Sequence, residues 1–224
     1  AGIFAALELV GVKNGLKILI IEKGRDINKR VCVAREQSRG CANCSPCSTI
    51  CGWGGAGAFS DGKLTLSTEI GGSLEQFTGV NGLNELINYI DQTYVKFGAP
   101  ERIFGLEHEE EIQEVQRRAV LSELKLIPVR IRHMGTGRCQ EVLQRMKEHL
   151  VEYGVEVMTS CPVEEVLLKD NTVRGVITRD GKIINAKHVV LAPGREGSEW
   201  LSREAGRLGL EMIINPVDIG VRVE

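Results

Sequence analysis

The chain has 224 residues, of which 42% are hydrophobic and 4% aromatic, and its formal net charge is −2. This length fits one large domain, or one and a half, with a sizeable core. The near-neutral charge and the few aromatic residues argue against a nucleic-acid partner, and the composition argues against disorder. No apolar stretch approaches the roughly 20 residues of a membrane helix, so we expect no membrane partner.

The cysteine content predicts where the protein works. The chain has seven cysteines, and four of them fall between positions 41 and 51, which is too close to staple a domain. The apolar opening, residues 1–12, contains Glu8 and lacks the basic start of a secretion signal. We therefore predict a cytoplasmic protein whose thiols serve metal or redox chemistry.

The first quarter of the chain has the pattern of an α/β protein. Residues 1–9 are predicted to be helical, and the apolar run 17–22, which ends in an acid, is typical of a strand buried in a parallel sheet. Residues 25–51 show no periodicity. Residues 52–63 form a glycine-rich loop.

The middle of the chain is mostly helical by its apolar spacing. Helices are predicted over 84–97, 109–124 and 139–154, the last closed by a glycine. Strands are predicted over 126–132 and 155–158.

The last third combines an antiparallel meander with further buried elements. Asp-Asn and Asp-Gly turns separate three alternating strands, at 163–168, 173–179 and 183–186. A second buried strand that meets a glycine is predicted over 187–194, a helix over 199–208 and a final strand over 217–224. The fold class is therefore α/β with an antiparallel insertion.

The acid at the end of the first strand suggests a dinucleotide site. In a Rossmann unit, glycines admit the pyrophosphate, a helix N-terminus faces its charge, and an acid about 20 residues later binds a ribose hydroxyl. Gly2 precedes Glu22 by 20 residues. Taken alone, this spacing is equally compatible with an ordinary strand-end glutamate.

Four further motifs extend this pattern along nearly the whole chain. They are Glu-Lys-Gly at 22–24, the glycine run with its Gly-Ala-Gly-Ala-Phe-Ser-Asp-Gly-Lys-Leu stretch at 52–64, Arg-His-Met-Gly-Thr at 132–136, and Val-Val-Leu-Ala-Pro-Gly-Arg at 189–195. Together they resemble the FAD-dependent dehydrogenases, flavoproteins of the glutathione-reductase-like two-dinucleotide-fold superfamily. The resemblance implies a Rossmann-like FAD-binding fold with a parallel sheet, an antiparallel β meander and a helical insertion.

The resemblance also implies an activity and a domain organisation. Such a protein would be an FAD-dependent oxidoreductase acting on a small-molecule substrate, with NAD(P)H or an electron-donor protein as its partner. Its FAD-binding domain would comprise residues 1–68 and 126–200, a helical insertion residues 69–125, and the start of a truncated substrate domain residues 201–224. The family's first Gly-x-Gly strand and its final Gly-Asp segment are missing, which predicts an internal fragment of a longer chain.

The resemblance assigns a set of residues to the cofactor. Glu22 would accept hydrogen bonds from the adenosine ribose, Gly2 would admit the pyrophosphate, and the loop glycines would let backbone amides approach the phosphates or the flavin ring. The alternative for that loop is a surface loop without function. The full set of predicted FAD-binding residues is Ala1, Gly2, Glu22, Lys23, Gly54, Gly55, Gly57, Ser60, Val163, Ala192 and Gly194.

The clustered cysteines have the spacing of a bacterial ferredoxin. The predicted metal ligands are Cys41, Cys44, Cys47 and Cys51. Their x2, x2, x3 spacing matches an iron–sulfur site, although Gly52 replaces the usual proline. In two-cluster ferredoxins the last cysteine serves the other cluster, so the fourth ligand here would be Cys51 or Cys32.

Two alternatives to an iron–sulfur cluster remain open for these cysteines. Four thiolates also suit structural zinc, and Cys44 with Cys47 could form a redox pair. Elsewhere, Cys139 and Cys161 are predicted to be buried small hydrophobes.

Two residues are candidates for catalysis. Lys63 could stabilise a reduced-flavin anion electrostatically, and His133 could place a proton donor or a cation near the flavin. The alternatives are a surface lysine paired with Asp61 and a loop histidine that bonds backbone. Thus an FAD-dependent oxidoreductase with an iron–sulfur relay is the leading prediction, and a non-catalytic flavin-binding module with structural zinc is its alternative.

Overall fold

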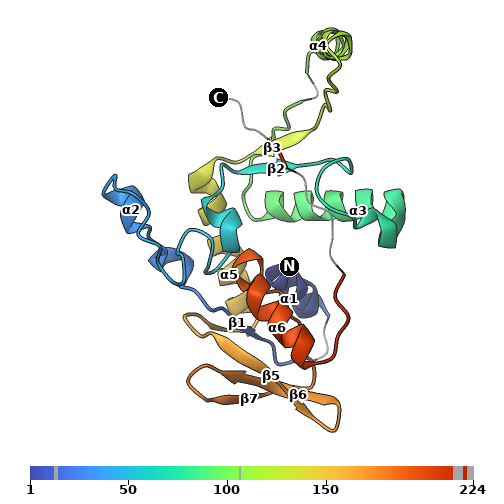
Figure 1. Cartoon of the computed structure of the whole chain (residues 1–224). Coiled ribbons are helices and arrows are strands. Elements are labelled where there is room, and N and C mark those ends of the chain that lie inside the picture. Colours follow the sequence, from blue (N-terminus) through green and yellow to red (C-terminus); the bar gives the residue numbers. More distant parts are fainter. Residues whose placement is uncertain (13–14, 106, 214–218, 221–224) are drawn as a thin grey trace. The chain divides into compact units, whose positions relative to one another are not determined.

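The computed structural model describes residues 1–12, 15–105, 107–213 and 219–220 (Figure 1). The chain forms two compact units, Ala1–Cys161 and Pro162–Glu224. The predicted division into a FAD-binding domain and an insertion concerns cofactor binding and stays a prediction.

The first unit contains a parallel strand pair. Helix α1 (Gly2–Gly11) precedes β1 (Leu19–Ile21), which pairs in parallel with β4 (Glu156–Met158), with Leu19 opposite Glu156 and Ile21 opposite Met158. The predicted helix 1–9 and the strands at 17–22 and 155–158 are thereby confirmed, although both strands are short.

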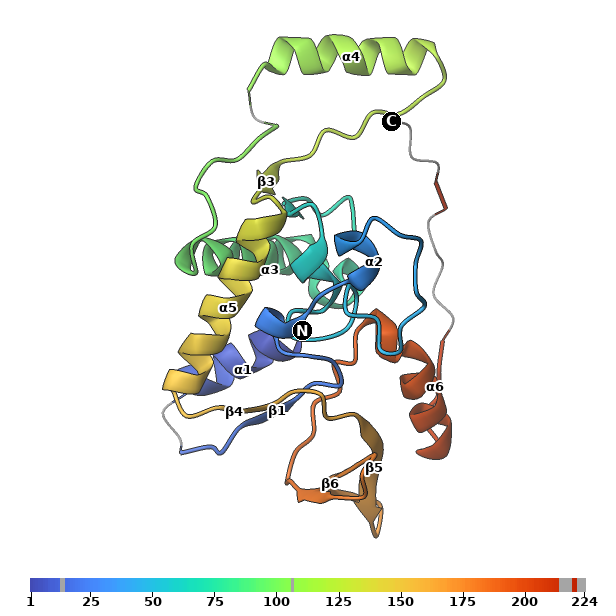
Figure 2. The ribbon, with the colours of Figure 1, turned by 90° about the vertical axis from the view of Figure 1, so that its left-hand side faces the viewer.

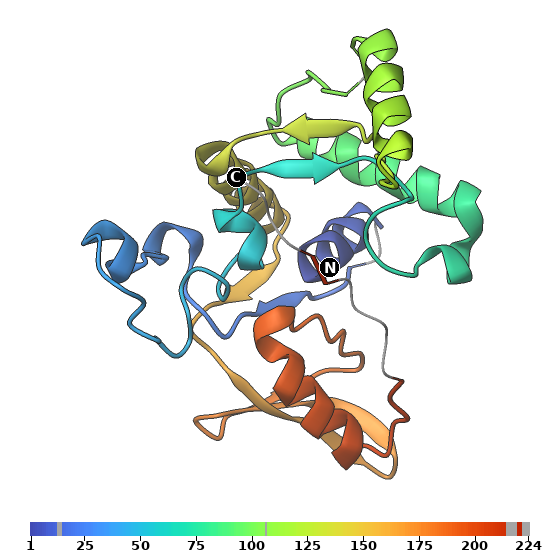
Figure 3. The ribbon, with the colours of Figure 1, turned by 45° about the horizontal axis from the view of Figure 1, so that its top comes forward.

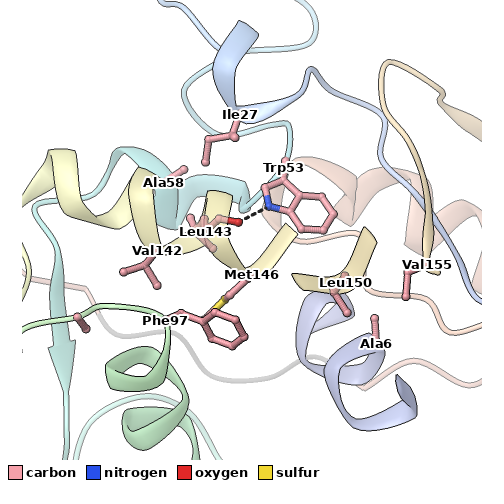
Figure 4. Close-up of a cluster of buried hydrophobic side chains, with 11 residues drawn as sticks. Ala6, Ile27, Trp53, Ala58, Phe97, Val142, Leu143, Met146, Leu150 and Val155 are labelled. Carbon is pink, nitrogen blue, oxygen red and sulfur yellow. Dashed lines mark hydrogen bonds between the residues drawn. The ribbon is translucent and has the colours of Figure 1, made fainter. Parts of the chain in front are cut away.

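Helix α5 (Thr136–Glu152) is the centre of the core of this unit (Figure 4). Val142, Met146 and Leu150 recur at helical spacing on one face, and each is fully buried. Trp53 donates its indole N–H to the carbonyl of Leu143, at 2.9 Å. The start of the glycine-rich segment is therefore part of the core.

Two helices and an antiparallel strand pair complete the first unit. Helix α3 (Glu75–Lys96) begins earlier than predicted because it continues across a kink at Gly79, and α4 (Glu109–Leu121) agrees with its prediction. Strand β2 (Lys63–Thr65) pairs antiparallel with β3 (Ile131–His133), and their arrows lie side by side in Figure 3.

A buried ion pair connects this strand pair to α3. The Arg132 guanidinium donates to both carboxylate oxygens of Asp91 and to the carbonyl of Pro100. Both charged side chains are almost fully buried. Because a buried charge is costly unless paired, this contact fixes β3 on α3.

The predicted strand 126–132 is wrong over most of its length. Only Ile131 and Arg132 of that range belong to β3. Pro128 has no backbone N–H to donate to a ladder, and Leu126 and Ile127 are exposed.

Short elements lie in segments predicted to be irregular. They are the 3₁₀ helices η1 (Ile27–Lys29) and η2 (Gly55–Phe59) and the one-turn helix α2 (Val33–Glu36). In the view of Figure 2, α5 runs from β3 to β4, past α1.

The second unit is a three-stranded meander with one helix. Strands β5 (Val163–Lys169), β6 (Thr172–Thr178) and β7 (Ile183–Asn185) pair antiparallel, as predicted. The first turn is formed by Asp170 and Asn171, both with positive φ, which suits a tight hairpin. Helix α6 (Ser198–Arg207) confirms the predicted helix, and η3 (Arg195–Gly197) precedes it.

The predicted strand 187–194 is wrong in this structure. Among the residues described, this segment joins no ladder, and Val190 and Leu191 are 67% and 38% exposed. An apolar run becomes a strand only where a neighbouring strand accepts its hydrogen bonds. Most of the predicted strand 217–224 lies outside the described residues.

A glutamate fixes α6 to the meander. Glu204 is 2% exposed, and its carboxylate accepts hydrogen bonds from the backbone N–H of Val166 and from the Arg207 guanidinium. Arg207 also donates to the carbonyl of Val166. Hydrogen bonding from Arg207 lowers the pKa of Glu204.

We expect this contact to make α6 acid-sensitive. A lowered carboxyl pKa adds stability above the ordinary glutamate value of about 4.3, and that stability is lost as the pH falls through the folded pKa. Glu204→Gln should destabilise the second unit by about 1–3 kcal/mol at neutral pH and remove the acid limb. Acid titration of Trp200 fluorescence measures this, with Trp200→Phe for subtraction and the exposed Glu199→Gln as control. An unchanged acid midpoint in Glu204→Gln would contradict the assignment.

Within the described part of the chain, no helix combines the length and apolar character that crossing a membrane requires.

Candidate functional site

The acid predicted to bind ribose lies at the carboxyl end of β1. The backbone N–H of Glu22 donates to the carbonyl of Met158 at 2.8 Å, which continues the β1–β4 pairing by one residue. The half-buried carboxylate accepts the N–H of Gly24 at 2.7 Å and the thiol of Cys51 at 3.7 Å, both through Oε1. The side chain is therefore held at the strand end where dinucleotide folds bind their ligand.

The turn after this acid is in backbone contact with the start of the glycine-rich loop. A Cβ on Gly24 would lie 2.5 Å from the amide nitrogen of Gly52. The N–H of Trp53 donates to the carbonyl of Arg25 at 3.0 Å. Glycine is required at positions 24 and 52, because these two backbone segments pass too close to each other for either residue to carry a side chain.

The glycines of this loop differ in what their surroundings require at each position. Gly54 and Gly55 have φ values of +84° and +60°, which L side chains rarely adopt. A Cβ on Gly54 would lie 2.5 Å from Leu143, so packing on α5 already requires glycine there. At Gly55 and Gly57 a Cβ would meet no protein atom within 4 Å. These two positions therefore face space that a ligand can enter.

Ser60 closes the loop. Its hydroxyl donates to the carbonyl of Gly57 at 2.9 Å and accepts the N–H of Gly62 at 3.2 Å. Its cofactor role stays a prediction, and the structure gives the side chain a local role in shaping the loop.

Lys63 and His133 lie opposite each other across the β2–β3 pair. Lys63 forms an ion pair with Asp61 at 2.9 Å, and His133 Nε2 lies 3.2 Å from the carbonyl oxygen of Asp61. The hydrogen bond from Lys63 lowers the pKa of Asp61. Both contacts are those of the non-catalytic alternatives, and a catalytic role for either residue stays a prediction.

The N-terminus of α1 can receive an anion. Ala1 is its N-cap, and no side chain caps the helix, which starts at Gly2. The N–H groups of a first helical turn favour phosphate. Lys23 is half-buried beside Glu22.

Three predicted cofactor residues belong to the second unit. Val163 begins β5, Ala192 lies in the segment without a ladder, and Gly194, with φ +64°, is the N-cap of η3. Their roles stay predictions.

The predicted metal ligands are not gathered into one site. Cys41 and Cys44 are exposed and Cys47 is half-buried, whereas Cys51 is buried with its thiol on Glu22. Among the described residues, no group of three or more His, Cys, Asp or Glu side chains could hold a metal ion. In this arrangement the four thiols do not fit a cluster or a zinc ion.

The remaining cysteines differ from one another. Hydrogen bonds from the backbone of Arg35 and from the side chain of Thr49 lower the pKa of Cys32. Cys139 is buried as predicted, and burial raises its pKa. Cys161 is only half-buried, so its predicted burial is wrong.

Sequence reasoning missed an open groove of about 510 Å³ in the first unit. It is lined by residues 66–69 after β2, residues 125–130 before β3, Asn84 and Gln116. No periodicity could have indicated it, because two irregular segments form most of its wall. Its lining includes neither Glu22 nor the glycine-rich loop.

FAD suits the groups that these elements provide. A strand-end carboxylate accepts ribose hydroxyls, an uncapped helix N-terminus attracts phosphate, and Gly55 and Gly57 leave open space. The parallel pair with its acid and the attached glycine-rich loop define an α/β, Rossmann-like nucleotide-binding protein.

The chain belongs to the FAD binding domain family, whose model matches residues 78–219, more than half of the chain. The match includes His133 and the predicted residues of the second unit. Glu22 and the glycine-rich loop precede it.

A protein of Clostridium beijerinckii, described as uncharacterized, is 32% identical over 228 residues, which cover 100% of this chain and 34% of that protein. The chain thus spans about a third of the length of this relative.

Solved structures show weaker likeness. Glycine oxidase from Geobacillus kaustophilus is 15% identical, with a TM-score of 0.48 over 94% of this chain and 56% of that one. L-amino acid deaminase from Proteus vulgaris is 17% identical, with a TM-score of 0.45 over 93% and 47%. These values are too low to assign an activity.

Proposed function

We propose that the protein is an FAD-dependent oxidoreductase acting on a small-molecule substrate. The observation that carries this proposal is the fixed carboxylate of Glu22 at the end of β1, joined by backbone contacts to the glycine-rich loop. Membership of the FAD binding domain family supports the choice of FAD as the nucleotide.

Several separate parts of the first unit would hold the cofactor. Glu22 accepts a ribose hydroxyl through Oε2, because Oε1 already accepts the N–H of Gly24. The first turn of α1 would hold the pyrophosphate, and the backbone at Gly55 and Gly57 would approach the ring. Lys63 and His133 would offer a cation and a proton donor from β2 and β3. Bound FAD supplies the exchange of a hydride or electrons with the substrate.

We also propose that the chain is an internal part of a longer protein whose preceding strand completes the parallel sheet. Two observations support this: the second edge of β1 joins no ladder among the described residues, and the Clostridium relative is about three times as long. The experiments below therefore use the full-length protein.

Purification of the full-length protein tests the main proposal. We expect yellow protein that releases FAD on denaturation and whose flavin absorbance bleaches when NADH, NADPH or a reducing substrate is added without oxygen. Colourless protein that binds no FAD in titration would refute the proposal. Yellow protein that no donor reduces would favour the non-catalytic flavin-binding module.

An iron–sulfur centre at Cys41, Cys44 and Cys47 remains a separate proposal, which the ferredoxin spacing supports. It requires the exposed cysteines to close around the metal, because they are apart in this structure. Iron, acid-labile sulfide and zinc should be measured in protein purified without oxygen. Stoichiometric iron and sulfide are expected, and stoichiometric zinc without sulfide would leave the cysteines a structural role.

A further inference from the structure

A buried arginine joins the cysteine segment to the glycine-rich loop. Arg30 is 4% exposed. Its Nε donates to the carbonyl of Ser48 at 2.9 Å, Nη2 to that of Thr49 at 2.9 Å, and Nη1 to that of Trp53 at 2.7 Å. One guanidinium thus holds three backbone carbonyls of the segment Cys47–Trp53, which we name the clamp turn.

Phe59, further along the glycine-rich loop, is also in contact with this side chain. The Arg30 Cζ atom lies 4.9 Å from the centre of the Phe59 ring, which ends η2. A Cβ on Gly52 would lie 2.6 Å from the Arg30 Cδ atom, so glycine there admits the arginine. Arg30 therefore contacts both the start of the glycine-rich loop and the end of η2 within it.

The charge of Arg30 interacts electrostatically with the proposed nucleotide acid. Burial lowers the pKa of Arg30, whereas the negative charge of Glu22 raises it. A planar guanidinium presents several donors in a fixed fork, and a lysine ammonium does not. The carboxylate of Glu22 and the backbone carbonyls of the clamp turn offset the cost of burying this charge.

Cys51 connects the clamp turn to the carboxylate of Glu22. Its backbone N–H donates to the carbonyl of Cys47 at 2.8 Å, which forms one helical turn. Its side chain is 5% exposed, and the thiol donates to Oε1 of Glu22. Cys51 is thus aimed at the carboxylate, whereas Cys41 and Cys44 are exposed.

We propose that Arg30 is a positioning residue of the nucleotide site, which holds the clamp turn so that Cys51 supports Glu22 and the glycine-rich loop begins beside the acid. This inference rests on the proposed function. It also assigns Cys51 to the nucleotide site and removes it from the predicted metal ligands.

A double-mutant cycle in the full-length protein tests this inference. The variants are Arg30→Met, Glu22→Ala and the double variant, with exposed Arg39→Met as a control for lost charge. FAD affinity is measured by titration, and chemical unfolding is followed separately. We expect Arg30→Met to weaken FAD at least 10-fold, Arg39→Met less than 2-fold, and the double variant to be no more than about 2-fold weaker than Glu22→Ala.

Two milder variants keep the test decisive if Arg30→Met does not fold. Arg30→Lys should lose most of the affinity, because a single ammonium nitrogen lacks the planar fork whose three separate nitrogens reach the three carbonyls. Cys51→Ala should weaken FAD several-fold, again without additivity to Glu22→Ala.

Multiplicative losses in the cycle, or FAD affinity within 2-fold of wild type in the folded Arg30 and Cys51 variants, would overturn the inference. A Glu22→Ala variant that binds FAD normally would instead reject the site on which it rests.

Discussion

Glu22→Ala in the full-length protein is expected to weaken FAD binding by about 1–3 kcal/mol, or roughly 5- to 150-fold. The carboxylate is half-buried and already fixed by the N–H of Gly24 and the thiol of Cys51. Its removal leaves the ribose hydroxyls and two protein donors without their acceptor. Because the acid arrives preorganised, its loss is not recovered by a rearranged side chain.

Glu156→Ala is the matched control for this variant. Glu156 is an exposed carboxylate at the other end of the same strand pair, opposite Leu19. FAD affinity is measured by fluorescence titration of flavin-free protein. If both variants keep wild-type affinity, the dinucleotide assignment of Glu22 fails.

The sequence predicted elements whose signal is local. The apolar run before Glu22 and the Asp170–Asn171 turn carry their own patterns, and β1 and the meander formed there. The position of Glu22 followed from the same pattern, because a strand that ends in an acid exposes that acid at the sheet edge.

Contacts between distant residues were beyond such patterns. Gly54 was assigned to the cofactor from its type, yet Leu143 on α5, 89 positions further along the chain, already requires glycine there. Cys51 fits a ferredoxin spacing, but the fold turns its thiol to Glu22. Spacing along the chain does not determine direction in space, and here the buried Arg30 donates to the carbonyls of Ser48 and Trp53 on either side of Cys51.

Strand prediction failed where a partner strand was needed. Residues 187–192 have the composition of a buried strand, and Val190 is 67% exposed. Composition states what the segment can bury, whereas its hydrogen bonds depend on another segment.

Gly55→Val is expected to give protein that folds but purifies without flavin. Gly55 has φ +60°, and a Cβ there would meet no protein atom within 4 Å. The added Cβ therefore meets no protein atom, and the side chain extends into the space proposed for the cofactor. A β-branched residue in this conformation also costs about 1–3 kcal/mol of folding stability, so a second effect must be separated from the first.

Gly154→Val separates the two effects. Gly154 follows α5, has φ +84° and is exposed, and a Cβ there would likewise meet no protein atom within 4 Å. It should show the same loss in the free energy of unfolding while retaining its flavin. Flavin content per protein and chemical unfolding are measured for both variants. Full flavin loading of Gly55→Val would mean that this glycine serves only the loop, and equal flavin loss in both variants would mean that backbone strain alone releases the cofactor.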